Sequence, residues 1–395
     1  MRVLFISDVY FPRVNGVSTS IRTFREDLGR RGVETLLIAP EYQGQPHPGD
    51  HGVIRVPAGR VPKDPEDRRL RWGALGRALQ ALETMDFDLI HIQTPFLAHY
   101  AGTRFAGRWG IPCIETYHTF FEEYAHHYVP ALPRVVGRAL ARTVTRSQCR
   151  DVRALIAPSE PLRDWLLTYG IRTPVHIIPT GLPADRFTPG DGRRFREYAG
   201  LPPDRPLVTY IGRVAHEKNI EFLVRMFVRV REAVPRAMLV IAGEGPARES
   251  LRRLVAGLGL EGDVHFAGYL DRDTTLLDCY AAATVFVFAS RTETQGLVLL
   301  EAMAQGAPVV STAELGTRSI LVPGCGALVV EEKVGPFAAA VARVLTERGL
   351  ASALSQQGRA YARTWSSAAM AGRLADLYRS VTEAANTVAR CAERM

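Results

Sequence analysis

The fold class is indicated most clearly by residues 207–245, LVTYIGRVAHEKNIEFLVRMFVRVREAVPRAMLVIAGEG. Two runs rich in Val, Ile and Leu, at 207–213 and 237–245, enclose a longer stretch in which apolar residues recur at helical spacing. A strand, a helix and a second strand in this order are typical of a parallel sheet that helices cover on both faces. The segment therefore predicts an α/β protein.

The same alternation continues in both directions along the chain. Further apolar runs occur at 3–7, 35–40, 88–93, 112–118, 154–159, 175–181, 264–269, 285–290, 308–312 and 327–332. A segment rich in Pro, Gly and charge, 182–206, is interpreted as a linker. We therefore predict two doubly wound, Rossmann-like domains, 1–185 and 186–369, that face each other across a cleft. The last stretch, about 370–395, is predicted to be an amphipathic helix that packs back on the N-terminal domain.

Composition narrows the class of protein. The formal charge of +8 indicates a surface that faces an anion, which could be nucleic acid, membrane headgroups or a phosphorylated substrate. The five cysteines are scattered without a C-x-x-C pair, which favours neither disulfides nor a zinc ribbon and fits a reducing cytoplasm. The N-terminus is interpreted as a first strand rather than a signal peptide, and no apolar run approaches the ~18 residues of a membrane span.

One candidate loop is SRTETQGLVLLEAMAQGAPVV, 290–310, which follows an apolar strand. Gly296 opens a helix, and a helix N-terminus behind a glycine is suited to binding phosphate. Glu293 precedes this helix and Glu301 lies within it, so the two carboxylates are expected to hold neutral hydroxyls, as on a sugar and a ribose. The alternative is that both glutamates are solvated.

A second candidate loop lies in 210–227, where Arg213 ends a strand and Lys218 precedes Asn219, the predicted N-cap of the next helix. The helix dipole does not favour two cations at this end, but a diphosphate between them would. The alternative is that the two cations are exposed and paired with Glu217 and Glu221.

Two further candidate loops contain glycine. In 12–22, PRVNGVSTSIR, Gly16 would let a ligand approach the backbone. In 242–251, AGEGPARESL, the start of a dinucleotide fingerprint is broken by Arg248, so the signal is weak on its own.

Together these segments resemble the nucleotide-sugar glycosyltransferases of family 4, which have the GT-B fold. The resemblance runs from SDVYFPRVNGVSTSI through IGRVAHEKNIEFL, VIAGEGP and VHFAGYL to TETQGLVLLEAMAQGAPVV. It implies that Glu293 contacts the hydroxyls of the donor sugar, that Glu301 contacts the ribose, and that Arg213 and Lys218 clamp the diphosphate. The family's usual Glu-Pro-Phe-Gly is here Glu293-Thr294-Gln295-Gly296, a departure that looks like bacterial enzymes that glycosylate diacylglycerol.

The resemblance also implies a wider donor site and a site for the acceptor. Donor-binding positions are expected at Gly16, Gly268, Tyr269, Gly296, Leu297 and Val298. Base recognition is expected to use backbone groups near Gly268 and Tyr269. Acceptor or membrane contacts are expected at Asn15, Tyr117 and Thr119.

The histidine-rich segment 114–138, IETYHTFFEEYAHHYVPALPRVVGR, also fits this resemblance. His118 occupies the position where the family directs a histidine at the donor sugar. A metal site is the alternative for His118, Glu122 and His126, but GT-B transferases generally need no bound metal and the segment has no other clear ligand cluster. Some of the aromatic residues are expected to pack in a core.

A basic stripe follows at Arg134, Arg138, Arg142, Arg146 and Arg150. A spacing of four spreads these side chains over roughly 160° of a helix, and Val135, Leu140 and Val144 are expected on the other side. Such a helix is suited to lying on an anionic bilayer, and the alternative is a solvated helix in an arginine-rich chain. Nucleic acid is not expected as a partner, because stacking platforms and binding motifs are lacking.

The sequence therefore predicts a retaining hexosyltransferase that moves a sugar, with UDP-glucose as the expected donor, to a membrane lipid such as diacylglycerol. It would need no cofactor or metal and would lie at the inner face of the cell membrane. The alternatives are a GDP-mannose-dependent enzyme acting on phosphatidylinositol or a polysaccharide, a nucleotide-sugar epimerase, and a membrane-binding protein without catalysis. The sequence indicates no oligomeric state.

Overall fold

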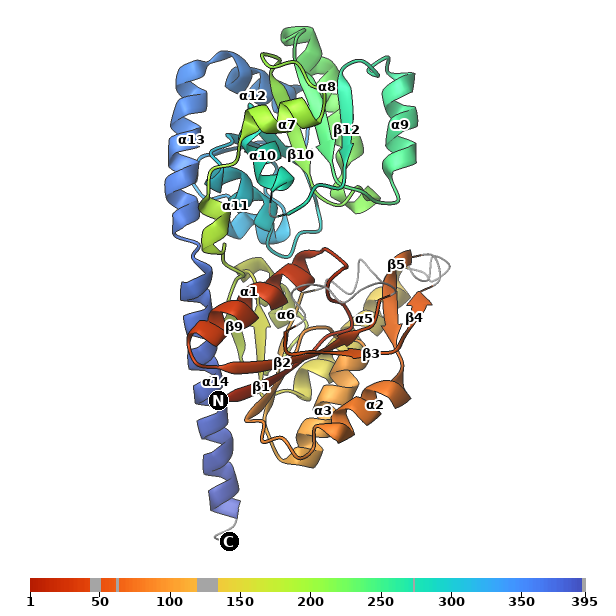
Figure 1. The fold of residues 1–395 in the computed structure, drawn as a ribbon, viewed down its shortest axis with the longest axis vertical. Coiled ribbons are helices and arrows are strands. Elements are labelled where there is room, and N and C mark those ends of the chain that lie inside the picture. Colours follow the sequence, from red (N-terminus) through yellow and green to blue (C-terminus); the bar gives the residue numbers. More distant parts are fainter. Residues whose placement is uncertain (43–50, 62–63, 119–133, 273, 393–395) are drawn as a thin grey trace. The chain divides into compact units, whose positions relative to one another are not determined.

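The structure, a computed structural model, describes residues 1–42, 51–61, 64–118, 134–272 and 274–392. It divides into unit 1, residues 1–181 with 367–395, and unit 2, residues 182–366. Each unit is built on a parallel sheet with helices packed on it (Figure 1). The predicted fold class, α/β with two doubly wound domains, is confirmed.

Unit 1 has a seven-stranded parallel sheet in the order β3-β2-β1-β6-β7-β8-β9. Its strands are β1 (Arg2–Ile6), β2 (Glu34–Pro40), β3 (Val53–Val56), β6 (Leu89–Ile92), β7 (Cys113–Thr116), β8 (Ala154–Ala157) and β9 (Val175–Ile177). A separate antiparallel hairpin consists of β4 (Ala58–Val61) and β5 (Asp64–Leu70). The helices are α1 (Gly16–Arg30), α2 (Trp72–Ala81), α3 (Leu97–Trp109), α5 (Arg134–Arg150), α6 (Glu160–Thr168) and α14 (Ser367–Ala392).

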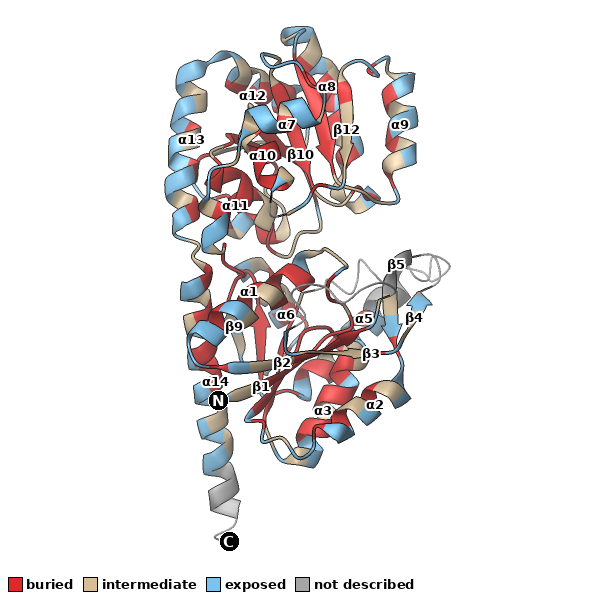
Figure 2. Cartoon of the chain, viewed as in Figure 1, coloured by how far each residue is buried: buried red, intermediate tan, exposed pale blue. Residues whose placement is uncertain are grey.

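Helices cover both faces of the unit 1 sheet, and its central strands β1, β6, β7 and β8 are accordingly buried (Figure 2). α1 and α14 pack together, and α2 packs on α3 (Figure 1). The core beneath α1 and α14 includes Phe5, Leu28, Leu374 and Tyr378. The C-terminal helix is therefore part of the core of unit 1, although the whole of unit 2 separates it from residues 1–181 in the sequence.

Unit 2 has a six-stranded parallel sheet in the order β12-β11-β10-β13-β14-β15. Its strands are β10 (Leu207–Ile211), β11 (Met238–Ala242), β12 (Val264–Gly268), β13 (Val285–Phe288), β14 (Val309–Ser311) and β15 (Ala327–Val329). Its helices are α7 (Gly192–Tyr198), α8 (Ile220–Ala233), α9 (Arg248–Gly257), α10 (Thr275–Ala282), α11 (Leu297–Ala304), α12 (Val334–Thr346) and α13 (Arg348–Arg363), with short 3₁₀ turns η1 (Ala184–Phe187), η2 (His216–Lys218) and η3 (Leu315–Ser319).

The segment predicted as a linker, 182–206, is instead a folded part of unit 2. Phe195 of α7 is buried in the core, and Arg194 forms an ion pair of 2.5 Å with the buried Asp278 of α10. A Cβ atom at Gly190 would lie 2.3 Å from the carbonyl oxygen of Leu277. The glycine here permits close packing against α10 rather than flexibility between domains.

Each sheet reverses its strand order once, between β1 and β6 in unit 1 and between β10 and β13 in unit 2. The connections that leave two such strands run to opposite sides, so a space opens at the carboxyl edge of the sheet, where doubly wound proteins bind ligands. In unit 2, the loops that flank this point carry Lys218 and Glu293.

Candidate active site

The Lys218 ammonium and the Glu293 carboxylate meet at the switch point of unit 2. Lys218 Nζ donates to Glu293 Oε1 at 2.6 Å, and both side chains retain about a fifth of their exposure, 20% and 19%. Lys218 ends η2 after β10, and Glu293 follows β13, the neighbouring strand. The sequence assigned these residues to the diphosphate and to the sugar, and the structure places them in direct contact.

The other cation of this loop, Arg213, lies near Glu217, with 3.6 Å between Nη1 and Oε1. The alternative, in which the two cations pair with neighbouring glutamates, therefore holds for Arg213 and Glu217. Lys218 instead pairs with Glu293, and Glu221 accepts from Arg225 at 2.7 Å. The two cations of the loop differ in their surroundings, and Lys218 is the one directed at the carboxylate of the β13 loop.

Asn219 precedes α8, but its side chain does not cap the helix as predicted. Its backbone is left-handed, with φ of 57°, and Asn219 Nδ2 donates to the carbonyl oxygen of Ala289 at 3.2 Å. The side chain thus ties the loop after β10 to the end of β13, which holds the loops of Lys218 and Glu293 together.

Gly296 precedes α11 as predicted, with a φ of 96° that favours glycine. A Cβ atom there would lie 3.0 Å from Thr317 Cγ2 of η3. Leu297 and Val298 form the first turn of α11 and are partly exposed. Their backbone N–H groups have no acceptor within the helix, so this end of α11 is suited to an anion.

Glu301 lies buried in α11, with 4% of its surface exposed, so its alternative reading as a solvated residue is wrong. Its Oε1 accepts from Arg272 Nη2 at 2.8 Å, and its Oε2 accepts from Tyr280 Oη at 3.0 Å. Sequence reasoning missed both partners. Arg272 follows β12 by four residues and lies in the same group of loops as Gly268 and Tyr269, but an arginine-rich chain gives it no distinguishing signal.

The AGEGP loop is shaped by close backbone contact rather than by a dinucleotide. A Cβ atom at Gly243 would lie 1.9 Å from the Gly212 carbonyl oxygen, and one at Gly245 would lie 2.4 Å from that of Val214. Arg248, which breaks the fingerprint, donates to Glu244 Oε1 at 2.6 Å. The loops after β10 and β11 therefore support each other beside Arg213.

Gly243→Ala is expected to destabilise unit 2 by about 3 kcal/mol or more, because the new methyl group overlaps a backbone oxygen and φ is +129°. Urea unfolding at equilibrium measures this. Gly257→Ala, at the end of α9 with open space around it, is the matched control and should cost nothing. Equal stabilities of the two variants would contradict the packing described.

In unit 1, the end of β7 carries two of the predicted residues. Tyr117, expected at the acceptor, is instead buried, and its hydroxyl lies 3.2 Å from Thr145 Oγ1 of α5. His118 is partly buried, and its Nε2 has no hydrogen-bond partner among the described residues. Burial lowers the pKa of His118 to about 4, so its imidazole is neutral at neutral pH. Thr119 lies outside the described residues, as do Glu122 and His126.

The buried acid of this region, Glu115, binds no group that suggests a metal. Its Oε2 lies 2.9 Å from His99 Nδ1, and both side chains are buried. Within the part of the chain that the structure describes, no three His, Cys, Asp or Glu residues lie close enough to hold a metal ion.

At the start of α1, Asn15 accepts from the backbone N–H of Ser18 at 2.8 Å and so caps the helix. The prediction placed Asn15 at the acceptor, and the cap occupies its side-chain oxygen. Gly16 has ordinary helical backbone and no atom within 4 Å of a Cβ built on it, so open space lies beside it.

Asp8 follows β1 and was missed by sequence reasoning. Its Oδ2 accepts from Thr94 Oγ1 at 2.7 Å and from the backbone N–H of Ala98 at 3.0 Å, at the start of α3. Burial raises its pKa from the ordinary 3.8 to about 6, although these hydrogen bonds act in the opposite direction.

This raised pKa predicts a pH-dependent stability. The folded protein binds the proton of Asp8 more tightly than the unfolded chain, so stability from this group is present below pH 3.8 and is lost as pH rises through 6. Between pH 7 and pH 4 the wild type should gain about 2 kcal/mol relative to Asp8→Asn, which cannot titrate. Urea unfolding of both proteins at several pH values tests this, and a constant difference would contradict it.

The basic stripe lies in α5, which includes all five arginines, but its orientation differs from the prediction. Leu140, expected on the side opposite the arginines, is 58% exposed. The buried side of α5 consists of Ala141, Thr145, Gln148 and Cys149. Arg142 and Arg146 donate to the carbonyl oxygens of Thr168 and Tyr169, at the C-terminus of α6, where cations are favoured.

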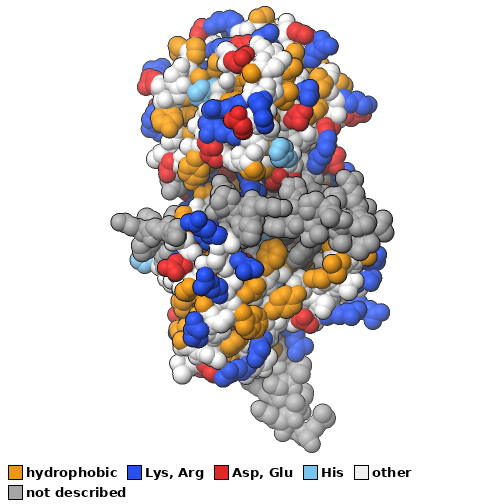
Figure 3. Space-filling view, turned by 90° about the vertical axis from the view of Figure 1, so that its right-hand side faces the viewer, with side chains coloured by type: hydrophobic (Ala, Val, Ile, Leu, Met, Phe, Trp, Pro, Cys, Tyr) orange, Lys and Arg blue, Asp and Glu red, His pale blue; other side chains and the backbone are white. Residues whose placement is uncertain are grey.

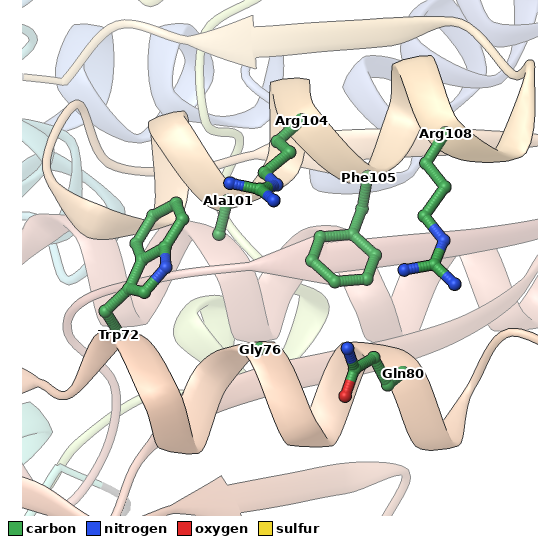
Figure 4. A pocket seen from close by; sticks show the side chains of 7 residues that line it. All are labelled: Trp72, Gly76, Gln80, Ala101, Arg104, Phe105 and Arg108. Atoms are coloured by element: carbon green, nitrogen blue, oxygen red, sulfur yellow. The ribbon is translucent and has the colours of Figure 1, made fainter.

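Unit 1 also has a small cavity of about 100 Å³ between α2 and α3 (Figure 4). It is lined by Trp72, Gly76, Gln80, Ala101, Arg104, Phe105 and Arg108. None of the residues predicted for the active site lines it. Arg108 donates to both carboxylate oxygens of Glu83 at 2.9 Å.

Two family models match the chain, one in each unit. Residues 14–186 match Glycosyltransferase Family 4, and residues 191–361 match Glycosyl transferases group 1. Solved GT-B structures share the fold, among them sucrose-phosphate synthase from Thermosynechococcus elongatus, with a TM-score of 0.80, 24% identity, and coverage of 97% of this chain and 99% of that chain. The two family models and the shared fold thus define a glycosyltransferase.

Curated relatives support the assignment to a family. An α-monoglucosyldiacylglycerol synthase of Streptococcus pneumoniae is 32% identical over 317 residues, 79% of this chain and 71% of that protein. A GDP-mannose-dependent α-mannosyltransferase of Mycobacterium tuberculosis is 31% identical over 379 residues, 91% and 93% of the two chains. The chain belongs to glycosyltransferase family 4, and the predicted retaining hexosyltransferase is confirmed at this level.

Proposed function

We propose that this enzyme transfers glucose from UDP-glucose to the hydroxyl group of diacylglycerol at the inner face of an anionic membrane. The observation that carries the proposal is the similarity to the α-monoglucosyldiacylglycerol synthases of S. pneumoniae and Acholeplasma laidlawii, at 32% and 27% identity. The local sequence Glu293-Thr294-Gln295-Gly296 agrees with it. The reaction needs no metal ion or cofactor and involves no nucleic acid.

The arrangement in unit 2 supports a role in binding the donor. When the diphosphate leaves, Arg213, Lys218 and the start of α11 would stabilise the negative charge that develops on it, which is where fixed charges and dipoles contribute most to rate. Glu293 would then accept from sugar hydroxyls, and Glu301 from the ribose. We expect front-face transfer, in which the leaving phosphate oxygen takes the proton of the acceptor hydroxyl.

The ion pair between Lys218 and Glu293 suits these two roles. Without donor, each charge neutralises the other at 2.6 Å. A bound diphosphate gives the ammonium a new anionic partner, and the carboxylate is then available to accept from sugar hydroxyls. The pair would thus hold both groups in place for the donor at little cost in desolvation.

The composition of three helices in unit 1 supports binding to an anionic membrane. α2, α3 and α5 contain one, two and five arginines and no Asp or Glu. Large apolar side chains are exposed on these helices at Trp72, Tyr100 and Leu140. The face of unit 1 seen in Figure 3 shows basic and hydrophobic side chains interspersed. Exposed apolar groups beside cations are typical of surfaces that bind anionic bilayers.

The described helices include none that is long and apolar enough to cross a bilayer, so the proposal is of attachment at the surface. Arg150→Gln and Leu140→Gln are each expected to weaken binding to vesicles that contain phosphatidylglycerol about fivefold, since each cation or buried apolar group contributes on the order of 1 kcal/mol. Vesicle sedimentation measures this. Arg379→Gln on α14 is the control, and an equal loss in that variant would contradict the proposed surface.

A second candidate is mannosyl transfer from GDP-mannose. It is favoured by the mannosyltransferase of M. tuberculosis, whose match with this chain extends over more residues than the match with either synthase. The donor site described would serve both sugars, because Lys218 and Arg213 face the diphosphate that the two donors share.

A transfer assay separates these functions. Labelled UDP-glucose, UDP-galactose, UDP-glucuronate and GDP-mannose are offered in turn with vesicles that contain diacylglycerol or phosphatidylinositol, each with and without phosphatidylglycerol. The proposal predicts that label from UDP-glucose enters the lipid phase with diacylglycerol, and more with the anionic lipid. Label transferred only from GDP-mannose would establish the second candidate instead, and Glu293→Gln controls for uncatalysed transfer.

A further inference from the structure

His91 is a buried histidine in the middle of the unit 1 sheet, and both of its ring nitrogens are hydrogen-bonded. It lies in β6 between Ile90 and Ile92, where an apolar residue would be expected. Its Nδ1 lies 2.7 Å from Tyr378 Oη of α14, and its Nε2 lies 2.7 Å from Thr116 Oγ1 of β7. A polar residue buried here costs free energy unless both nitrogens are satisfied, and they are.

The contacts of His91 connect the C-terminal helix to the end of β7, two residues before the predicted sugar-binding histidine. Thr116 is the last residue of β7, and His118 follows it by two positions, so the bond to Thr116 holds the strand end from which the chain leads to His118. Burial, with a smaller contribution from His118, lowers the pKa of His91 to about 3. His91 therefore stays neutral and has one donor and one acceptor nitrogen to share between its two partners.

We propose that His91 is a positioning residue for His118. The hydrogen-bonded series Tyr378–His91–Thr116 fixes the end of β7 and so the place of His118, and it makes the geometry of the site depend on the docking of α14. The inference rests on the proposed role of His118 at the donor sugar.

Packing alone does not require this arrangement. The ring of Tyr378 is buried in the core of unit 1 beside Leu374, and a phenylalanine would fill the same space. An apolar residue at position 91 would also pack between Phe5, whose ring centre lies 4.9 Å away, and Tyr378. The three polar groups instead bond to one another, and they bond at the strand end that carries His118.

Two variants each remove a single polar group from the series and keep its shape, Tyr378→Phe and Thr116→Val. Leu374→Val is the control, because it loosens the packing of the same helix without changing a hydrogen bond. The first readout needs no substrate: the imidazole ¹⁵N–¹H spectrum of histidine-labelled protein, with the His118 signal assigned from His118→Gln. The proposal expects the His118 signal to move in both variants and to stay in place in the control.

The second readout is the rate with a donor and acceptor pair that gives turnover. Each of the two variants should lower kcat about tenfold with little change in the KM for donor, since displacement of a positioned group costs rate rather than binding. The double variant should lose no more than either single one. Because the spectrum is independent of turnover, failure of the glucose assay leaves this test intact. An unmoved His118 signal in both variants, or an equal shift in Leu374→Val, would overturn the proposal.

Discussion

Lys218→Ala is expected to lower kcat/KM for the donor by two to three orders of magnitude, on the scale seen when a fixed group that stabilises a leaving oxyanion is removed. Lys218 Nζ lies 2.6 Å from Glu293, so the variant also leaves a partly buried carboxylate without its partner, where it repels the diphosphate. Steady-state kinetics with labelled donor measures the loss.

Lys333→Ala provides the control for Lys218. Lys333 forms an ion pair of the same length, 2.6 Å, with Glu331 in the same unit, but its side chain is 70% exposed. Exposed pairs contribute little, so this variant should keep its kinetics and its stability. A rate for Lys218→Ala near that of Lys333→Ala would remove Lys218 from the site.

His118→Ala is expected to lower kcat about a hundredfold while the KM for donor changes little, because an interaction made mainly in the transition state affects the rate constant of the chemical step. Since the pKa of His118 is lowered to about 4 by burial, its imidazole does not change charge between pH 5.5 and 8. The pH profiles of kcat for the wild type and for the variant should therefore have the same shape. No inflection near pH 6.5 should be present in the wild type and absent from the variant.

His176→Ala is the control for His118, because His176 is an exposed histidine of β9 in the same unit. It should keep the wild-type kcat at every pH. An inflection near pH 6.5 that is lost only in His118→Ala would show that His118 titrates in the working range, contrary to its burial.

The main strands could be predicted because strands buried on both faces are short apolar runs, and all twelve predicted runs form strands of the two sheets. The strand β3 was missed. It is short, and its pattern is interrupted by Arg55, whose side chain donates to the Pro40 carbonyl oxygen at 3.0 Å. The hairpin of β4 and β5 was missed because its second strand, DPEDRRL, has almost no apolar residues.

The candidate site could be predicted where chain position alone determines proximity. Arg213, Lys218, Glu293 and Gly296 follow neighbouring strands, and the parallel sheet brings such loops to one edge. Arg272 and Tyr280 could not be predicted as the partners of Glu301, because neither stands out from its surroundings. Tyr280 lies in α10 among apolar residues, and its hydroxyl finds a partner only through the fold.

The orientation of α5 could not be predicted from hydrophobicity because its buried side is partly polar. Thr145 lies opposite the hydroxyl of Tyr117, and Gln148 donates to the Pro95 carbonyl oxygen at 2.7 Å. These contacts bury polar side chains and leave Leu140 at the surface. The apolar residues of this helix therefore did not predict which of its residues are buried.

The central proposal is retaining transfer of glucose to a lipid, and the anomeric configuration of the product tests it most directly. Purified enzyme is incubated with UDP-glucose and vesicles of diacylglycerol and phosphatidylglycerol, and the glycolipid is extracted for proton NMR. The proposal predicts a single glucosyl diacylglycerol with the α configuration of the donor. A β-linked product, or glucose released only into water, would contradict it.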